Sequence, residues 1–171
     1  IYAANQGTGV EIVNVVAPSN PTLVGEYPAP ADNQVNDVHA IGSYAYVVSA
    51  EDDDGWLRIV DVSDPTDPAE ITTYDTPGNA QRLFVTDTVA YVADGSAGLR
   101  IIDVSDPLSP TELSHVAPPT GGATDAVWVG SRQALVGSNT DSGWWLEAFD
   151  VSDPANPASL AHQEGTGGLH D

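Results

Sequence analysis

Carboxylates are the groups in this sequence that are most able to do chemistry. One aspartate recurs in three copies of a repeated phrase, each time before Val-Ser-Asp-Pro: Asp61, Asp103 and Asp150. A ring of these carboxylates could bind metal ions, but a structural role is favoured, because Asp and Ser side chains in this context accept backbone N–H bonds in Asx and Ser/Thr turns. The proline that closes each phrase fixes φ and ends the strand. These prolines are Pro65, Pro107 and Pro154.

A second acidic feature is the run Glu-Asp-Asp-Asp-Gly at residues 51–55. Asp52 and Asp54 match part of a calcium-loop spacing, but Ala50 stands where the first ligand belongs and no Glu follows at the far position. A solvated charge run is therefore the favoured interpretation, with a structural Ca²⁺ held by Asp52 and Asp54 as the alternative. We expect no other cofactor.

Other nucleophiles and ligands show no catalytic spacing. The histidines form no zinc pattern with one another, and there is no cysteine and no Gly-x-Ser-x-Gly elbow. They are His39, His115, His162 and His170. The sequence therefore predicts no catalytic residue.

The elements that position these groups come from an internal repeat. The first proline of the repeated phrase falls at residues 18, 65, 107 and 154, so the spacings are 47, 42 and 47 residues. A period near 40–45 residues with strand content is that of a β-propeller blade. Each unit reads as four short strands rich in Val, Ile, Tyr and Thr, bounded by Gly, Pro, Asp and Ser.

The fold class predicted is therefore all-β, a single propeller of four-stranded blades of 42–47 residues. The expected units are the end of one blade (1–30), three blades (31–77, 78–120 and 121–166) and the start of another (167–171). Two arrangements fit these units. The favoured one is part of a larger ring of about six to eight blades; in the other, residues 169–171 complete the opening blade and close a four-bladed ring.

The first strand of each blade lies next to the central channel, so its polar residues are the candidates for ligand binding at the channel mouth. Aligning the first strands gives one column with Asn36, Gln81, Asp125 and His170. The next column holds Asp37, Arg82, Ala126 and Asp171. The competing interpretation is that these polar groups bond to adjacent blades and lock the ring, because buried polar groups are normally hydrogen-bonded.

The phrase Leu-Arg-Ile-Val-Asp-Val-Ser-Asp-Pro-x-x-Pro at residues 57–68 resembles the signature of the LVIVD-repeat family, as does Ala-Tyr-Val-Ala-Asp-Gly at 90–95. The resemblance runs along essentially the whole chain. It implies a β-propeller on a bacterial or archaeal surface or in a secreted protein, and it brings no established reaction. The first copy departs from the pattern, with Asn14 in place of the repeated Asp, which is expected to weaken the turn there.

Charge sets this chain apart. It has 25 acidic residues against four basic ones, all arginines, for a formal net charge of −21. Such a field repels nucleic acid, and molar salt would screen its self-repulsion. An acidic surface without lysine resembles those of extreme halophiles, and an acidic extracellular domain that binds Ca²⁺ is the alternative. No apolar run is long enough to insert directly into a membrane.

These features predict a non-enzymatic module that lies outside the cell or on its surface, in a halophile, and that binds a protein partner or associates with itself. The alternative is a metal-dependent hydrolase or lactonase with its site at the channel mouth, which would need three or more ligands that converge on an open metal position.

Overall fold

The computed structural model describes residues 1–28, 34–119, 124–140 and 143–166. These residues form four antiparallel sheets in chain order. The first sheet contains β1 (Tyr2–Asn5), β2 (Gly9–Asn14) and β3 (Thr22–Pro28). The second contains β4 (Gln34–Ile41), β5 (Tyr44–Glu51), β6 (Asp54–Asp61) and β7 (Ala69–Thr76). The third contains β8 (Arg82–Thr86), β9 (Val89–Ala93), β10 (Leu99–Asp103) and β11 (Thr111–Val116). The fourth contains β12 (Ala126–Gly130), β13 (Gln133–Thr140), β14 (Gly143–Asp150) and β15 (Ala158–Thr166).

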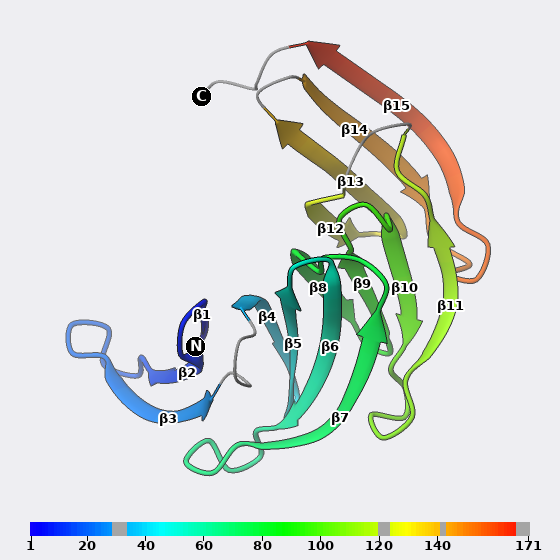
Figure 1. The fold of residues 1–171 in the computed structure, drawn as a ribbon. Helices are drawn as coiled ribbons and strands as arrows, with labels where there is room; N and C mark the ends of the chain where they lie inside the picture. The colour runs from blue at the N-terminus through cyan, green and yellow to red at the C-terminus, as the bar shows by residue number, and fades with distance from the viewer. Residues whose placement is uncertain (29–33, 120–123, 141–142, 167–171) are drawn as a thin grey trace.

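The sheets stand side by side and fan out into an open arc (Figure 1). Each is a meander in which consecutive strands pair. Along the inside of the arc the first strand β8 contacts β4 on one side and β12 on the other. In the first sheet β1 pairs with β2 as β5 pairs with β6, so β1–β3 correspond to the second, third and fourth strands of the other sheets. Among the described residues no helix has the length and apolarity needed to cross a membrane.

The same irregularity recurs in every sheet. The pairing of the third strand with the fourth shifts after Ile12, Ile59, Ile101 and Ala148, four equivalent positions. A bulge of this kind bends the strand and increases its twist. The repeat in the sequence is thus a repeat of backbone geometry as well as of residue types.

The core lies between consecutive sheets, in three clusters of apolar side chains. We call the side of a sheet that packs on the next one in the chain its forward face, and the opposite side its rear face. Leu57 and Ile59 are on the forward face of the second sheet and pack on Val92 and Ile102 of the third. Because apolar residues are needed on both faces, the strands read as nearly continuous apolar runs with little alternation.

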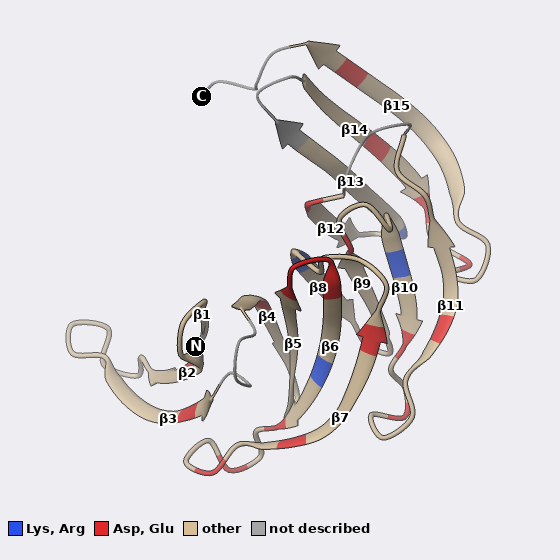
Figure 2. Ribbon diagram, in the orientation of Figure 1, with Lys and Arg blue, Asp and Glu red and all other residues tan. Residues whose placement is uncertain are grey.

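Charge is distributed unevenly over this framework. Figure 2 shows acidic residues on strands and loops of all four sheets, and basic residues on β6, β8 and β10. Two of these basic residues, Arg58 and Arg100, are largely buried and form ion pairs between strands.

Candidate functional site

A polar pocket of about 410 Å³ opens where the loops at the start of β4 and β8 meet the tip of the β5–β6 hairpin. Seven of its eight lining residues are polar, and five of these carry carboxamides. The lining residues are Gln6, Gln34, Asn36, Ala50, Glu51, Asp52, Asn79 and Gln81. We call this cavity the mouth pocket, because two of its members, Asn36 and Gln81, come from the predicted channel-mouth column.

Hydrogen bonds fix the floor of the mouth pocket. The Asn36 Nδ2 donates to the Ala80 carbonyl of the next sheet at 2.8 Å. The Gln81 Nε2 donates to Asn79 Oδ1, and the Asn79 Nδ2 donates to the Asp52 carbonyl. Asp52 sits at the hairpin tip with φ 52°, a left-handed conformation that Asp adopts more readily than most residues. These bonds leave the Asn36 Oδ1, the Gln81 Oε1 and the two carboxylates to meet a ligand.

The electrostatics of the mouth pocket are those of a neutral-to-acidic hydrogen-bonding site. No Lys or Arg side chain lines it, and Glu51 and Asp52 are exposed. His39 of β4 does not line the pocket and packs edge-on against Phe84, with 5.0 Å between the ring centroids. Burial lowers the pKa of His39, in spite of the nearby Asp37 carboxylate, so its ring is neutral at pH 7. The pocket offers donors and acceptors to hydroxyl or amide groups.

Two members of the second predicted column, Asp37 and Arg82, link the second and third sheets. The Asp37 Oδ2 accepts a bond from the Leu83 amide of the third sheet at 3.0 Å, and its Oδ1 accepts from the Val38 amide at 2.9 Å. The Arg82 guanidinium donates to the carbonyls of Asn36 at 3.2 Å and Gln81 at 2.9 Å. Asp37 and Arg82 therefore join the inner strands β4 and β8, which is the interpretation that competed with ligand binding.

The rest of the first column is not brought to the mouth pocket. Asp125 lies beside the fourth sheet, where its Oδ1 is buried without a hydrogen-bond partner. His170 and Asp171 fall outside the described residues. Conversely, sequence reasoning did not select Gln6, Gln34 or Asn79. Gln34 and Asn79 each stand two residues before a column member, but this spacing carries no motif by which they could have been found.

The calcium candidates Asp52 and Asp54 lie in the same β5–β6 hairpin but do not line the same pocket. Asp52 lines the mouth pocket, whereas Asp54 pairs with Glu51 at the base of the turn and does not line it. Within the described ranges no three His, Cys, Asp or Glu side chains are grouped as metal ligands. A structural Ca²⁺ at this loop stays a prediction that rests on the sequence.

The repeated aspartates cap turns. The Oδ1 atoms of Asp61, Asp103 and Asp150 each accept the amide N–H two residues ahead at 2.8 Å. These bonds, from Ser63, Ser105 and Ser152, hold the pKa of each carboxyl below its ordinary value. Pro65, Pro107 and Pro154 lie in the turns that follow. In the first copy the Asn14 Oδ1 accepts from the Val16 amide at 2.9 Å, so the departure from Asp leaves this bond in place.

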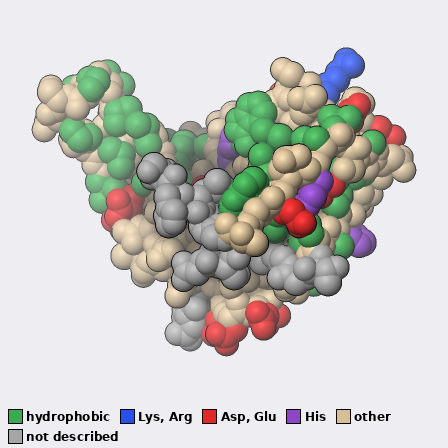
Figure 3. Space-filling view, turned by 90° about the horizontal axis from the view of Figure 1, so that it is seen from above, with side chains coloured by type: hydrophobic (Ala, Val, Ile, Leu, Met, Phe, Trp, Pro, Cys, Tyr) green, Lys and Arg blue, Asp and Glu red, His purple; other side chains and the backbone are tan. Residues whose placement is uncertain are grey.

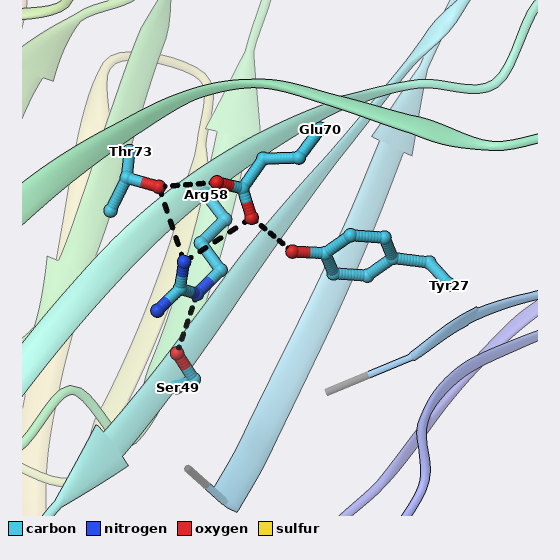
Figure 4. Close-up of polar contacts among 5 residues, drawn as sticks. All are labelled: Tyr27, Ser49, Arg58, Glu70 and Thr73. Carbon is cyan, nitrogen blue, oxygen red and sulfur yellow. Dashed lines mark hydrogen bonds and ion pairs between the residues drawn. The ribbon is translucent and has the colours of Figure 1, made fainter. Parts of the chain in front are cut away.

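A polar cluster joins the first two sheets, and the sequence did not reveal it (Figure 4). The Tyr27 hydroxyl of β3 donates to the Glu70 carboxylate of β7, which also accepts from Arg58 Nη1 at 3.2 Å. Arg58 donates further to Thr73 and Ser49. Burial opposes ionisation of Glu70, but its hydrogen bonds and the Arg58 charge still keep the pKa of Glu70 below its ordinary value. Burial and the Glu70 contact raise the pKa of Tyr27.

A second candidate surface is the forward face of the fourth sheet, which forms a mainly apolar hollow of about 620 Å³. Trp128 and Leu146 are 53% and 45% exposed there. The Trp128 ring lies over Gly130 and the Trp144 ring over Gly165, positions where a Cβ would clash with the indole. We call this surface the open face; its members are Ala126, Trp128, Leu135, Gly137, Trp144 and Leu146.

Comparison with family models identifies the repeat. The model described as LVIVD repeat matches residues 1–29, 33–76 and 77–117, two thirds of the chain. The chain belongs to the LVIVD-repeat family. Its predicted membership is thereby confirmed, and the matched segments correspond to the first three sheets. No curated protein matches the chain.

Solved structures resemble this LVIVD-repeat chain in fold. The computationally designed Ika8 protein has a TM-score of 0.73 at 9% identity, covering 98% of this chain and 46% of its own. The periplasmic gluconolactonase PpgL of Pseudomonas aeruginosa has a TM-score of 0.71 at 15% identity, covering 95% and 53%. A hypothetical selenium-binding protein of Sulfolobus tokodaii has a TM-score of 0.67 at 11% identity, covering 85% and 44%.

The chain thus spans about half the length of these three structures. At such low identity the likeness shows the fold alone. Together with the family match it confirms an all-β protein of propeller type, whose described residues form four antiparallel sheets. The number of blades in a complete ring stays a prediction.

Proposed function

We propose that this protein is a non-enzymatic binding module that is secreted or displayed on the cell surface, and that its mouth pocket receives a neutral, hydroxyl-rich group of a partner, such as a glycan. The observation that carries the proposal is the composition of the pocket, with five carboxamides, two carboxylates and no basic side chain. Carboxamides offer both a donor and an acceptor, which is what a sugar hydroxyl requires.

The charge of the pocket narrows the ligand class. Glu51 and Asp52 would repel a phosphate or a carboxylate, whereas a hydroxyl can donate to either oxygen. A volume near 410 Å³ is within the range of small-molecule sites.

The test is titration of the protein with three neutral disaccharides, maltose, cellobiose and lactose. NMR chemical-shift changes of the protein report binding. We expect binding of at least one sugar with Kd near 1 mM, a free energy of about −4 kcal/mol. Gln34→Ala should weaken sugar binding about tenfold, since the Gln34 side chain is exposed in the pocket and makes no hydrogen bond with the described residues, while its backbone pairing with Ala50 is unchanged by the substitution. Gln133→Ala is the matched control, being exposed on β13 away from the pocket. Absence of binding by all three sugars contradicts the ligand class.

The enzymatic alternative makes a different prediction. The likeness in fold to the periplasmic gluconolactonase motivates a lactone-hydrolysis assay with added divalent cations. Lactone hydrolysis that depends on a stoichiometric metal would contradict the binding-module proposal and support a hydrolase, because metal-dependent hydrolysis needs a metal-bound water.

The acidic composition supports a halophilic setting for this module. We expect the melting temperature to rise as KCl increases from about 0.1 M to about 3 M, because added salt shortens the Debye length and screens the repulsion within a chain of net charge −21. Circular dichroism melting curves measure this. EDTA is the control, since a fall in melting temperature on chelation would indicate a structural Ca²⁺ instead. Destabilisation by added KCl would contradict the halophilic setting.

A further inference from the structure

A buried carboxylate stands behind the wall of the mouth pocket. Asp94 directly follows β9 and is 0% exposed. The strand registers place Ser49 of the second sheet and Ser138 of the fourth at the equivalent position. A hydroxyl is therefore sufficient for the blade, whereas burial of a carboxylate costs free energy. The repeat alone does not account for an aspartate at this position.

Asp94 bonds to the segment that joins the second sheet to the third. We call this segment, residues 77–81 between β7 and β8, the linker. The Asp94 Oδ2 accepts a hydrogen bond from the Gly78 amide at 3.1 Å. A Cβ at Gly78 would lie 2.1 Å from the Asp94 carbonyl oxygen, and a Cβ at Gly55 would lie 2.3 Å from the Gly78 carbonyl oxygen. The linker is thus packed closely between the β5–β6 hairpin and the turn after β9.

The linker carries one wall of the mouth pocket. Two of its residues, Asn79 and Gln81, line the cavity and bond to each other through their side chains. The Asn79 side chain also donates to the Asp52 carbonyl at the hairpin tip. The linker carbonyl of Ala80 accepts from the Asn36 side chain. A displacement of the linker therefore moves several pocket groups together, and the shape of the pocket depends on where the linker is held.

We propose that Asp94 is a positioning residue for the mouth pocket, which holds the linker through the Gly78 amide and thereby sets where Asn79 and Gln81 present their carboxamides to a ligand. A carboxylate accepts a charge-assisted bond from an amide N–H, which is stronger than the bond that a serine hydroxyl accepts. This is what the buried charge adds over the serines at the equivalent positions. The proposal rests on the proposed function of the pocket and adds to it a residue that touches no ligand.

Titratable groups from three strands surround the Asp94 carboxylate. The Arg100 Nε of β10 lies 3.5 Å from the Asp94 Oδ2. Arg100 is bonded in turn to Glu112 of β11 at 2.6 Å, and Glu112 also contacts His115. Tyr74 of β7 faces the same group from the second sheet. Burial raises the pKa of Asp94, and its hydrogen bonds and the Arg100 charge oppose this effect only in part.

The raised pKa of Asp94 gives the pH effect its direction. As the pH falls, Asp94 binds a proton at a higher pH than an aspartate of ordinary pKa does. Protonation removes the charge from the bond to Gly78, so the linker is held less firmly and the affinity of the pocket for a sugar should fall. Acidic side chains are also spread over the face seen in Figure 3, and Glu51 and Asp52 lie in the pocket itself. Their protonation adds to the pH profile, so the contribution of Asp94 is measured against a variant that lacks only its charge.

The experiment follows the side-chain NH₂ signals of Asn79 and Gln81 by NMR, first in the ligand-free protein and then with maltose, cellobiose and lactose. Asp94→Ala should displace both signals and weaken sugar binding about tenfold, because the linker loses a hydrogen bond. Asp94→Asn keeps an oxygen that accepts from Gly78, so it should retain the signals and the affinity at pH 7. In acid, the native signals should show a titration step that Asp94→Asn lacks.

Glu112→Gln is the matched control, since it removes a charge beside the same arginine, while Glu112 itself bonds to Arg100 and His115. Unmoved Asn79 and Gln81 signals in Asp94→Ala, or equal displacement in Glu112→Gln, overturn the proposal. If Asp94→Ala does not fold, identical pH profiles of the native protein and Asp94→Asn overturn it. A failed sugar titration contradicts the proposed ligand class, whereas the signals of the ligand-free protein test the role of Asp94 separately.

Discussion

Replacing Arg58 by methionine should lower the free energy of unfolding by about 2–4 kcal/mol, because it leaves the Glu70 carboxylate without its cation at a sheet interface. Arg58 is 8% exposed and donates to Ser49, Glu70 and Thr73, so few water molecules can take over its bonds. The Glu70 side chain is 34% exposed, which keeps the expected cost below that of a fully buried charge. Urea denaturation followed by circular dichroism measures the change.

Arg132→Met is the matched control for Arg58→Met, since Arg132 is exposed in the β12–β13 turn. A double variant, Arg58→Met with Glu70→Leu, should regain part of the lost stability, because it removes both charges together. A coupling energy near zero between the two positions would show that the Arg58–Glu70 ion pair does not stabilise the fold.

Gly25→Ala is the second change with a large expected effect. A Cβ at Gly25 would lie 2.0 Å from the Pro65 carbonyl oxygen, which belongs to the backbone of the neighbouring sheet. The first sheet must move away from the second to relieve this overlap, and it thereby loses the Tyr27 bond to Glu70. We expect a loss of about 1–3 kcal/mol and faster cleavage of the first sheet by a protease.

Gly7→Ala is the control for this change, because a Cβ at Gly7 meets nothing within 4 Å. Equal stability of Gly25→Ala and the native protein would contradict the close approach of the two sheets. Unfolding curves measure the loss of stability, and timed proteolysis measures the cleavage of the first sheet.

The architecture could be predicted from the sequence because the same pattern of strands and turns occurs in four copies of the repeat. Strand-forming runs, turn prolines and the period agree with one another in each copy, and the aspartates that cap the turns need only local bonds. The family followed from the same phrase. Local signals of this kind depend on residues that are neighbours in the chain, so they can be interpreted without knowing the fold.

The candidate site was predicted only in part, because its lining residues come from different sheets and depend on how those sheets pack. Asn36 and Gln81 were selected by alignment, and they do line one pocket. Gln6, in the turn after β1, reaches the same pocket by the packing of separate sheets, which no local pattern reveals. The Arg58 cluster was missed for the same reason, since Tyr27 and Glu70 are 43 residues apart.

The stacking of the sheets also determines how the molecule opens. Each sheet rests on its immediate neighbours, so the second and third are held on two sides and the first and fourth on one. Stability is then approximately a sum of sheet and interface terms along a line, as in other repeat proteins. Amide hydrogens of β5, β6, β9 and β10, which belong to the two sheets packed on both faces, are therefore expected to exchange with solvent only when an interface beside them breaks.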